Sequence, residues 1–510
     1  MNDTGNVTLC GSGPGDPGLI TVAARDAIAG AEVIVYDYLV NSKLLEYAPP
    51  SCEKIYVGKK GGRHTMEQEQ INELLCTKAR EGNRVVRLKG GDPYIFGRGS
   101  EEALYLKEKG VSFAVIPGIP AALGAAAYAG IPLTDRRYNS SVTFVTGHED
   151  PAKKESTINW RALARSQSTL VFYMGVKNLP SIARRLIEQG MDGATPVSVV
   201  RWATTPLQQT VTGTLETIAR KAAKAGIKPP ALTVVGKVNQ LHKSIAWFEN
   251  LPLFGKKIAV TRSRTQASAL SGKLAELGAD TIEMPVIEIS PQESTKEIDR
   301  AIRSLSSYAW VVFTSVNGVS LFMDRVYALG FDARIFAPVK IAVIGSATAS
   351  RLKEYGIRPN FEPSKFTSAV LFEELRARET IDDKKFLLAR ADIAGKELPE
   401  NLKQYGARVD DIIVYKTVPG TTDTTQIETL IEEGSLDGVT FTSSSTVKYF
   451  IDALGKAFID RIKDSIAAFS IGPETTKALK TAGIRPATQA SVHTIPGLVE
   501  SIRNYYDRNQ

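Results

Sequence analysis

The chain has 510 residues, of which 43% are hydrophobic and 23% charged, which is typical of a globular protein with room for three or four domains. No apolar run approaches the ~18 residues that cross a bilayer, so we expect no membrane partner. Most of the net charge of +8 belongs to the first half, because residues 1–250 carry 30 Lys and Arg against 23 Asp and Glu, and the remainder 33 against 32. Since no basic block is interleaved with aromatic residues, the excess favours an anionic small molecule over nucleic acid.

Cysteine and histidine are too few and too scattered for a metal centre. The three cysteines, Cys10, Cys52 and Cys76, have no metal-type spacing, and only four histidines occur. We therefore expect no metal and no structural disulfide. The first residues lack the basic and apolar regions of a signal peptide, so the expected location is the cytoplasm.

The first strand, at residues 7–10, runs into a loop of glycine and proline at 11–18 and a helix over 19–29. Asp16 is the expected cap of that helix and Pro17 its first residue. The loop is not a dinucleotide fingerprint, because Pro14 interrupts the amide donors that a pyrophosphate requires. It suits close backbone contact with a ligand that is not a phosphate.

Further strands are expected at 32–37, ending in Asp37, at 55–60, and at 84–88, with a helix over 65–81. The strand at 84–88 leads into the most informative stretch, residues 87–99 (RLKGGDPYIFGRG). Gly90 and Gly91 allow a ligand to approach the backbone, Asp92 starts a turn, and a helix begins at Ser100.

A third sharp loop, residues 117–122 (PGIPAA), follows a strand at 113–116 and opens a helix over 121–129. Loops at the carboxyl ends of parallel strands gather at one edge of a sheet. Three such loops in one α/β unit therefore predict a shared ligand cleft.

Residues 130–140 are expected to link this unit to a second one. Its predicted strands are at 141–146, 169–174, 197–200 and 232–236, and its predicted helices at 179–189 and 214–225. Another linker is expected at 247–254.

The remaining half contains an internal repeat. Residues 257–264 (KIAVTRSR) correspond to 385–392 (KFLLARAD), 311–318 (VVFTSVNG) to 439–445 (VTFTSSS), and 341–348 (IAVIGSAT) to 468–475 (AFSIGPET). Each copy alternates strands with helices, which predicts parallel sheets covered by helices and a cleft between two lobes. The fold class expected for the whole chain is α/β.

The first half resembles the uroporphyrinogen-III C-methyltransferases of the tetrapyrrole methylase family. The resemblance spans about residues 5–248, with subdomains at about 5–133 and 138–248. It rests on residues 11–21 (GSGPGDPGLIT), 35–40 (VYDYLV), 57–59 (VGK), 87–99, 117–122, 130–134 (GIPLT), 145–148 (VTGH) and 172–175 (FYMG).

The second half resembles uroporphyrinogen-III synthase over about residues 255–505. The motifs are residues 261–262 (TR), 313–317 (FTSVN), 344–348 (IGSAT), 415–417 (YKT), 441–444 (FTSS), 471–476 (IGPETT) and 493–497 (HTIPG). By analogy with that family, one lobe would hold 255–288 and 419–505, and the other 291–415.

The resemblance of the first half implies S-adenosyl-L-methionine as cofactor. The positions that match the family's cofactor contacts are Pro14, Gly90, Gly91, Asp92, Ile95, Pro120, Ala121, Met174 and Ala203. Pro120 stands where the family often has threonine or serine, so a hydroxyl contact is lost there. The same resemblance makes Asp37 the base that accepts the ring proton and Lys59 the acid.

Ordinary roles remain open for several of these side chains. Asp37 could instead be a cap or turn residue, and Lys59 could bind a substrate carboxylate. Arg63 and Arg98 are expected to pair with carboxylates of the substrate, as are Arg136 and Arg137, although a solvated surface role is open for each.

In the second half the expected substrate contacts are Arg262, Thr314, Ser315, Ser443 and Thr475. Tyr415 matches a tyrosine that the family places near its cleft and could protonate a departing hydroxyl; the alternative is a core tyrosine at a strand end. Hydroxyls and amides, rather than paired carboxylates, predominate in these loops.

The resemblances together imply a bifunctional enzyme whose substrates are tetrapyrroles. The second half would close hydroxymethylbilane to uroporphyrinogen III, and the first half would methylate that product twice, as a homodimer formed through the methyltransferase half. One alternative treats the second half as a non-catalytic tetrapyrrole-binding module. Another makes the first half a methylase of a later corrin intermediate, against which the paired Asp37 and Lys59 signals and the fused synthase argue.

Overall fold

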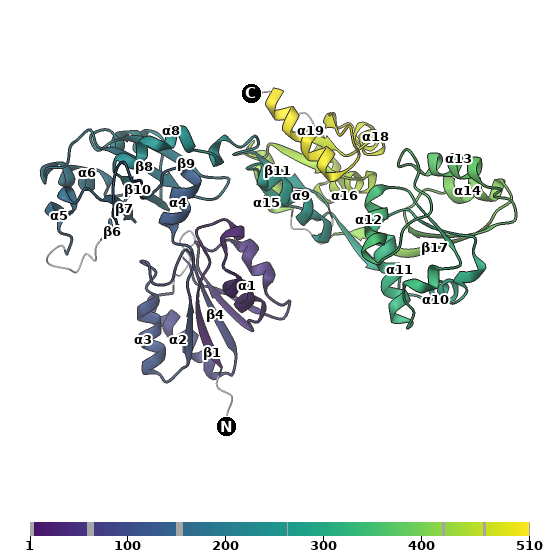
Figure 1. The fold of residues 1–510 in the computed structure, drawn as a ribbon, viewed down its shortest axis with the longest axis horizontal. Helices are drawn as coiled ribbons and strands as arrows, with labels where there is room; N and C mark the ends of the chain where they lie inside the picture. Colours follow the sequence, from purple (N-terminus) through teal and green to yellow (C-terminus); the bar gives the residue numbers. More distant parts are fainter. Residues whose placement is uncertain are drawn as a thin grey trace. The chain divides into compact units, whose positions relative to one another are not determined.

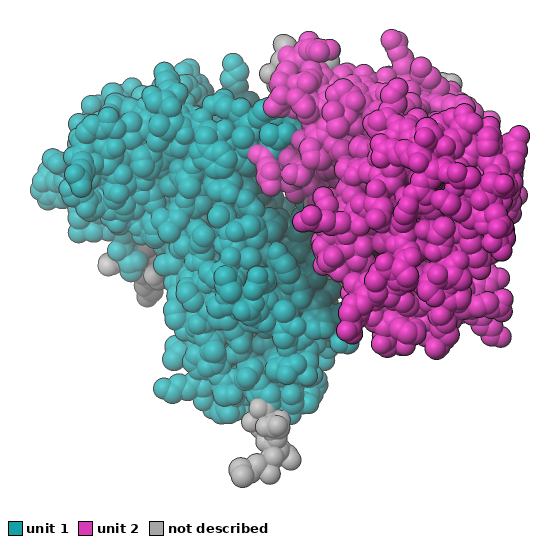
Figure 2. All heavy atoms as spheres, turned by 45° about the vertical axis from the view of Figure 1, so that its right-hand side comes forward, with its two compact units in different colours: residues 1–256, 277–280 teal, residues 257–276, 281–510 magenta. Residues whose placement is uncertain are grey.

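The computed structural model describes residues 5–58, 66–148, 157–262, 264–420, 424–462 and 466–508. The chain divides into two compact units, one of residues 1–256 and 277–280, the other of 257–276 and 281–510 (Figure 2). None of the helices in the described ranges has the length and apolar character that crossing a bilayer requires.

The first sheet is parallel. The three glycine-containing loops expected to bind a ligand, within residues 11–18, 87–99 and 117–122, follow its strands at their carboxyl ends. Its strand order is β3-β2-β4-β1-β5. The strands are β1 (Asn6–Gly11), β2 (Val33–Tyr36), β3 (Glu53–Tyr56), β4 (Arg84–Lys89) and β5 (Phe113–Ile116), and the helices are η1 (Pro17–Leu19), α1 (Val22–Ala29), η2 (Ser42–Tyr47), α2 (Gln68–Arg80) and α3 (Gly99–Glu108).

Both faces of this sheet are buried, which explains its nearly continuous apolar strands. Val85 of β4 packs with α2 and α3 on one face, and its neighbour Val86 packs with α1 and η2 on the other. Figure 1 shows α2 and α3 on the side of the sheet opposite α1.

The second sheet, of order β6-β7-β10-β8-β9, is mainly antiparallel; only β6 and β7 run parallel. Its strands are β6 (Val142–Thr146), β7 (Thr169–Tyr173), β8 (Pro196–Arg201), β9 (Gln209–Thr214) and β10 (Ala231–Val235), and the helical segments that follow or separate them are α5 (Trp160–Arg165), α6 (Leu179–Glu188), α7 (Ile218–Lys224), η3 (Lys237–Leu241), α8 (His242–Ile245) and η4 (Phe248–Asn250).

Helix α4 (Ala121–Ala129) belongs to the second sheet by packing, although it follows β5 in the chain. Its alanines Ala122, Ala125 and Ala129 contact apolar residues of β7, β8 and β10. Small side chains allow the helix to lie close to the sheet. The loop after β5 therefore connects the two sheets of this unit directly.

In the second unit the repeat is realised with exchanged strands. The sheet of order β12-β11-β18-β19-β20 combines the first strand of copy one with the later strands of copy two. The sheet of order β13-β17-β16-β14-β15 does the reverse. Each sheet therefore needs both copies.

The elements of the first of these sheets are β11 (Lys257–Val260), β12 (Asp280–Glu283), β18 (Gly438–Phe441), β19 (Ala467–Ser470) and β20 (Pro486–Gln489), with α9 (Arg264–Glu276), α15 (Thr425–Glu432), α16 (Ser444–Leu454), α17 (Lys456–Ile462), α18 (Pro473–Thr481) and α19 (Ile495–Arg508). Those of the second are β13 (Ile287–Pro291), β14 (Trp310–Phe313), β15 (Lys340–Val343), β16 (Lys385–Ala391) and β17 (Arg408–Pro419), with α10 (Lys296–Arg303), η5 (Leu305–Ser307), α11 (Val316–Ala328), η6 (Ala333–Phe336), α12 (Ser346–Glu354), α13 (Ser368–Arg378) and α14 (Glu397–Gln404).

Several predicted elements need correction. Asp16 caps the short turn η1, accepting from Gly18 N at 2.8 Å, whereas Thr21 caps the helix that follows. The segment predicted as a helix from 214 contains the end of strand β9 before α7 begins at Ile218. Strand β13 is antiparallel to β17, so the last sheet is mixed rather than parallel. The α/β fold class is confirmed.

Candidate functional site

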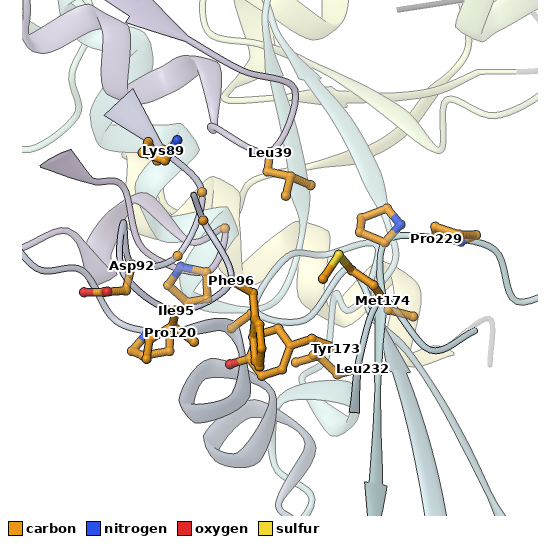
Figure 3. A pocket seen from close by; sticks show the side chains of 18 of the residues that line it. Leu39, Lys89, Asp92, Ile95, Phe96, Pro120, Tyr173, Met174, Pro229 and Leu232 are labelled. Carbon is orange, nitrogen blue, oxygen red and sulfur yellow. The ribbon is translucent and has the colours of Figure 1, made fainter. Parts of the chain in front are cut away.

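A cavity of about 610 Å³ lies in the first unit, between the carboxyl edge of the first sheet and the second sheet with α4. Its wall is mostly apolar, with a few charged groups, as in many small-molecule sites. Figure 3 shows Met174 and Pro229 on one side of this space and Lys89, Asp92 and Ile95 on another.

The nine residues that the sequence predicted as cofactor contacts all line this one cavity. They come from five separate segments and are Pro14, Gly90, Gly91, Asp92, Ile95, Pro120, Ala121, Met174 and Ala203. Asp37 and Arg98 line it too. Lys59 and Arg63 lie outside the described residues.

The two glycine loops are joined by their backbones at the cavity wall. Gly91 N donates to Gly13 O at 2.7 Å, and Gly13 N donates to Gly91 O at 3.2 Å. Gly91 adopts φ +69°, a left-handed conformation that a side chain disfavours. At Gly118 a Cβ would lie 2.1 Å from Gly91 O, so the third loop also requires glycine to fit against the second.

The Asp92 carboxylate braces these loops. Its Oδ1 accepts from Tyr94 N at 2.8 Å and its Oδ2 from Gly118 N at 3.0 Å. Because both oxygens serve the protein backbone, this side chain fixes the relation between two loops. A ligand in the cavity can still contact the Asp92 main chain.

The Pro14 loop is also fixed to the second half of its unit. Asp16 N donates to Thr204 Oγ1 at 2.9 Å, and the Tyr128 hydroxyl donates to Asp16 Oδ2 at 2.6 Å. Burial raises the pKa of Tyr128, and the bond to Asp16 adds to this, so the phenol stays protonated as the donor. The cavity therefore has walls that are held together by polar contacts.

Unusual backbone conformations gather around the cavity. Phe96, Arg98, Met174 and Trp202 all line it and have φ between 46° and 57°. Such conformations cost about 1–3 kcal/mol each and occur mainly where packing over-determines a functional site. The Phe96 ring also packs on Tyr173, with centroids 4.9 Å apart, so the apolar wall is preset.

Asp37 follows β2 and presents its carboxylate to the cavity. Its Oδ1 accepts from Leu39 N at 3.1 Å and its Oδ2 from Arg87 at 3.3 Å. A carboxylate offers about four lone-pair sites, so two further sites remain for a ligand. The first bond makes Asp37 a turn residue as well, and the turn role and the base role are compatible.

Arg98 is paired within its own helix. Its guanidinium donates two hydrogen bonds to Glu101, at 2.9 and 2.7 Å. The pair is half-exposed, and the hydrogen bond to Arg98 holds the pKa of Glu101 below its usual range. A substrate carboxylate would therefore compete with Glu101 for this arginine.

Sequence reasoning missed a cluster of buried charges beside Asp37. Arg87 and Lys89 of β4 both contact Glu102 of α3, and all three side chains are almost fully buried. The available signal was two basic residues at alternate positions of a strand otherwise expected to be buried, since long charged side chains are rarely buried unpaired.

The predicted residues of the second unit form two groups, one at each sheet. Arg262, Ser443 and Thr475 follow the parallel strands β11, β18 and β19, so they lie at one carboxyl edge. Thr314 and Ser315 follow β14, and Ser315 caps α11 as Ser443 caps α16. Burial lowers the pKa of Arg262.

Tyr415 on β17 meets the second group. Its hydroxyl lies 3.0 Å from Ser315 Oγ, and the tyrosine is 6% exposed. Burial raises the pKa of Tyr415, against the hydrogen bonds with Ser315 and Asn317 that lower it. The phenol therefore stays protonated, although it also has the burial of a core tyrosine.

Two family models match this chain in succession. Residues 6–219 match Tetrapyrrole (Corrin/Porphyrin) Methylases, and residues 268–500 match Uroporphyrinogen-III synthase HemD. The first match contains most of the cavity wall, and the second contains the predicted residues of the second unit except Arg262. Together they define a methylase joined to a tetrapyrrole synthase.

One relative matches this chain over nearly its whole length, and others match part of it. The porphyrin biosynthesis protein HemD of Ruminiclostridium josui is 37% identical over 98% of this chain and 97% of its own length. A uroporphyrinogen-III C-methyltransferase of Bacillus subtilis is 41% identical over 69% of this chain and 72% of its own, and an S-adenosyl-L-methionine-dependent uroporphyrinogen III methyltransferase of Methanosarcina barkeri is 52% identical over 47% and 93%. The chain belongs to the family in which a tetrapyrrole methylase is fused to uroporphyrinogen-III synthase HemD.

Proposed function

We propose that the chain is a bifunctional enzyme of tetrapyrrole biosynthesis. Its second half closes hydroxymethylbilane to uroporphyrinogen III with inversion of one ring. Its first half transfers two methyl groups from S-adenosyl-L-methionine to carbons of that product, giving precorrin-2 on the route to sirohaem or cobalamin. The two halves correspond to residues 5–248 and 255–505.

The observation that carries the methyltransferase proposal is that the nine residues expected from the family resemblance as cofactor contacts converge on one cavity. Its wall suits a cofactor with an adenosine and an amino acid end but no phosphate. The apolar side has Ile95, Met174 and Leu232, while the paired backbones of Gly13 and Gly91 leave room beside the loops. When bound, the cofactor supplies an electrophilic methyl group.

The protein's own contribution is orientation and one proton transfer. Holding two reactants in line can replace much of the entropy that a bimolecular step loses. The pyrrole ring that accepts a methyl group must later lose a proton from another of its positions, and the Asp37 carboxylate accepts it at the cavity wall. Arg98 binds a substrate carboxylate in exchange for Glu101, and Lys59 and Arg63 keep their proposed roles of acid and carboxylate partner.

In the second half the proposed acid is Tyr415. Its phenol, held by Ser315, donates a proton to the hydroxyl that leaves hydroxymethylbilane. Carboxylates of the linear substrate are bound by Arg262 and by hydroxyl groups and helix amides near Thr314, Ser443 and Thr475. Dimerisation through the methyltransferase half and a cytoplasmic location complete the proposal.

The test is to supply each half with its own substrate. Purified chain given hydroxymethylbilane alone should form the type III isomer faster than spontaneous closure forms type I. The same chain given uroporphyrinogen III and S-adenosylmethionine should add two methyl groups. Type I product at the spontaneous rate, with methylation intact, would instead make the second half a binding module.

A further inference from the structure

The buried charges at the cavity wall form a connected group, here called the Glu102 cluster: Asp37, Arg87, Lys89 and Glu102. The side chains of Arg87, Lys89 and Glu102 are 4%, 5% and 0% exposed, while Asp37 is 27% exposed. Asp37 is therefore the most exposed member, and Arg87 and Lys89 also line the cavity wall. The cluster has two positive and two negative groups and no net charge.

Glu102 is the hub of this cluster. Its Oε1 accepts from Lys89 Nζ at 2.8 Å and from Arg87 Nε at 3.2 Å. Gln68 adds a third donor to the same oxygen at 3.2 Å. Glu102 thereby fixes one side of the Arg87 guanidinium.

The other donors of Arg87 are directed by the sheet. One terminal nitrogen donates to the carbonyls of Val35 and Leu88, at 3.3 and 3.1 Å. The other donates to Asp37 Oδ2 at 3.3 Å. Arg87 is thus held on three sides and has one donor group directed at Asp37, an arrangement that a planar guanidinium allows and an ammonium does not.

Stability alone does not account for such a cluster. Buried ion pairs repay their desolvation poorly, and apolar side chains of similar volume stabilise as well or better. The cluster also lies at the wall of the cavity beside Asp37. Its members do not belong to the apolar core on either face of the first sheet.

We propose that Arg87 is a positioning residue that orients the Asp37 carboxylate toward the substrate, and that Glu102 positions Arg87. This rests on the proposed function, in which Asp37 accepts the ring proton. Leu39 N and Arg87 each hold one carboxylate oxygen, which fixes the orientation of the carboxylate at the cavity wall and leaves its remaining lone pairs for the substrate. Neither Arg87 nor Glu102 transfers a proton.

The test uses Arg87→Met and Glu102→Gln, which remove one charge each with little change of volume. In single-turnover methylation of uroporphyrinogen III we expect each to be about 10–100-fold slower, the scale of a misplaced catalytic group. Affinity for S-adenosylmethionine and the KM for uroporphyrinogen III should stay within about twofold, because Glu102 is fully buried and the donors of Arg87, although it lines the cavity, are bonded to protein acceptors. Arg87→Lys, which keeps the charge, should fall between the parent and Arg87→Met.

The decisive measurement is the single-turnover methylation rate when Arg87→Met or Glu102→Gln is combined with Asp37→Asn. Residues that act through one group are non-additive, so Arg87→Met and Glu102→Gln should have no further effect there. Should Arg87→Met fail to fold, Arg87→Lys answers the same question. Glu53→Gln is the control, since it breaks the ion pair between Glu53 of β3 and Lys78 of α2, neither of which lines the cavity, and it should keep the parent rate.

Two outcomes overturn the proposal. A loss that persists in the Asp37→Asn background, with a raised KM for uroporphyrinogen III, makes Arg87 a direct substrate contact. Parent rates in both cluster variants while Asp37→Asn is slow show that Asp37 needs no positioning. If Asp37→Asn is itself as fast as the parent, the proposed base is wrong, which is a separate failure.

Discussion

Asp37 tests the chemistry of the first half at the scale of one residue. Asp37→Asn keeps the size of the side chain and removes its basic site. Acid–base groups contribute about 10²–10⁴-fold, so methylation should slow by that range in single-turnover experiments. Calorimetry should find the affinity for S-adenosylmethionine nearly unchanged. A lost affinity would make Asp37 a cofactor contact, and a parent rate would assign the proton to water or another group.

Gly91 tests the location of the cofactor site. Gly91→Leu places a bulky side chain at a φ of +69° beside the cavity, so S-adenosylmethionine binding should be lost while the synthase half keeps its activity. Gly110→Leu is the matched control, because Gly110 has φ +71° and open space around it. If both variants bind the cofactor equally well, the glycine loops do not form its site.

At the scale of residues, the sequence predicted those cavity residues that stand in distinctive loop motifs. Pro14, Gly91 and Met174 stand in distinctive motifs, and the structure brings them to one cavity. Glu102 could not be found this way, because an acidic residue in the first turn of a helix ordinarily serves the helix dipole. Its partners become visible only when β4 and α3 are placed side by side.

At the scale of elements, Glu379 ties the end of α13 to the sheet of β14 and β15. It contacts Lys340, accepts from Lys384 at 3.0 Å, and accepts from the Trp310 ring at 3.2 Å. The bond to Lys340 is the main cause that lowers the pKa of Glu379 from 4.5 to about 2. The carboxylate therefore stabilises the fold above its unfolded pKa, and this contribution is lost as the pH falls through about 2.

The corresponding variant is Glu379→Gln. At pH 7 it should lower the Tm of the second unit by a few degrees, since about 1 kcal/mol corresponds to about 2–4 °C in a domain of this size. Calorimetry should find the difference constant from pH 7 to about 5 and shrinking as the pH falls from about 4.5 toward 2. Glu373→Gln, in an exposed pair with Arg376 on the same helix, should cost less. A difference that is constant with pH would assign the effect to packing.

The repeat shows what patterns can and cannot predict about elements. Periodicity located the strands of both copies, because buried parallel strands are continuous apolar runs. Periodicity could not reveal that the copies exchange their first strands. The apolar sequence of β11 is as compatible with pairing to the strands of its own copy as to those of the other copy. The antiparallel strands β8 to β10 likewise depend on tertiary pairing, and part of β9 was predicted as helix.

At the scale of the whole molecule, the segment expected to be a linker is structured. Trp247 Nε1 donates to Ala127 O at 2.9 Å, and Phe248 packs on Tyr128 with ring centroids 4.7 Å apart. Leu253 is fully buried, and its N–H donates to Leu277 O at 2.8 Å. Aromatic residues near a predicted boundary were the signal that this stretch is packed rather than free.

Division of the chain should separate the two activities. We expect fragments 1–250 and 251–510 to fold independently, each with its own core, and to retain methyltransferase and synthase activity respectively. The shorter fragment 256–510 lacks Leu253 and should unfold at lower temperature, because loss of a buried leucine costs about 2–5 kcal/mol. Equal unfolding temperatures of fragments 251–510 and 256–510 would show that residues 251–255 contribute nothing to the stability of that half.

The central claim is that one chain makes uroporphyrinogen III and then methylates it. The most direct measurement supplies the intact chain with hydroxymethylbilane and S-adenosylmethionine together and identifies the products by mass and isomer type. The account predicts a dimethylated product with the type III arrangement, and loss of the methyl groups alone in Gly91→Leu. Accumulation of uroporphyrinogen I without methylated type III product would contradict it.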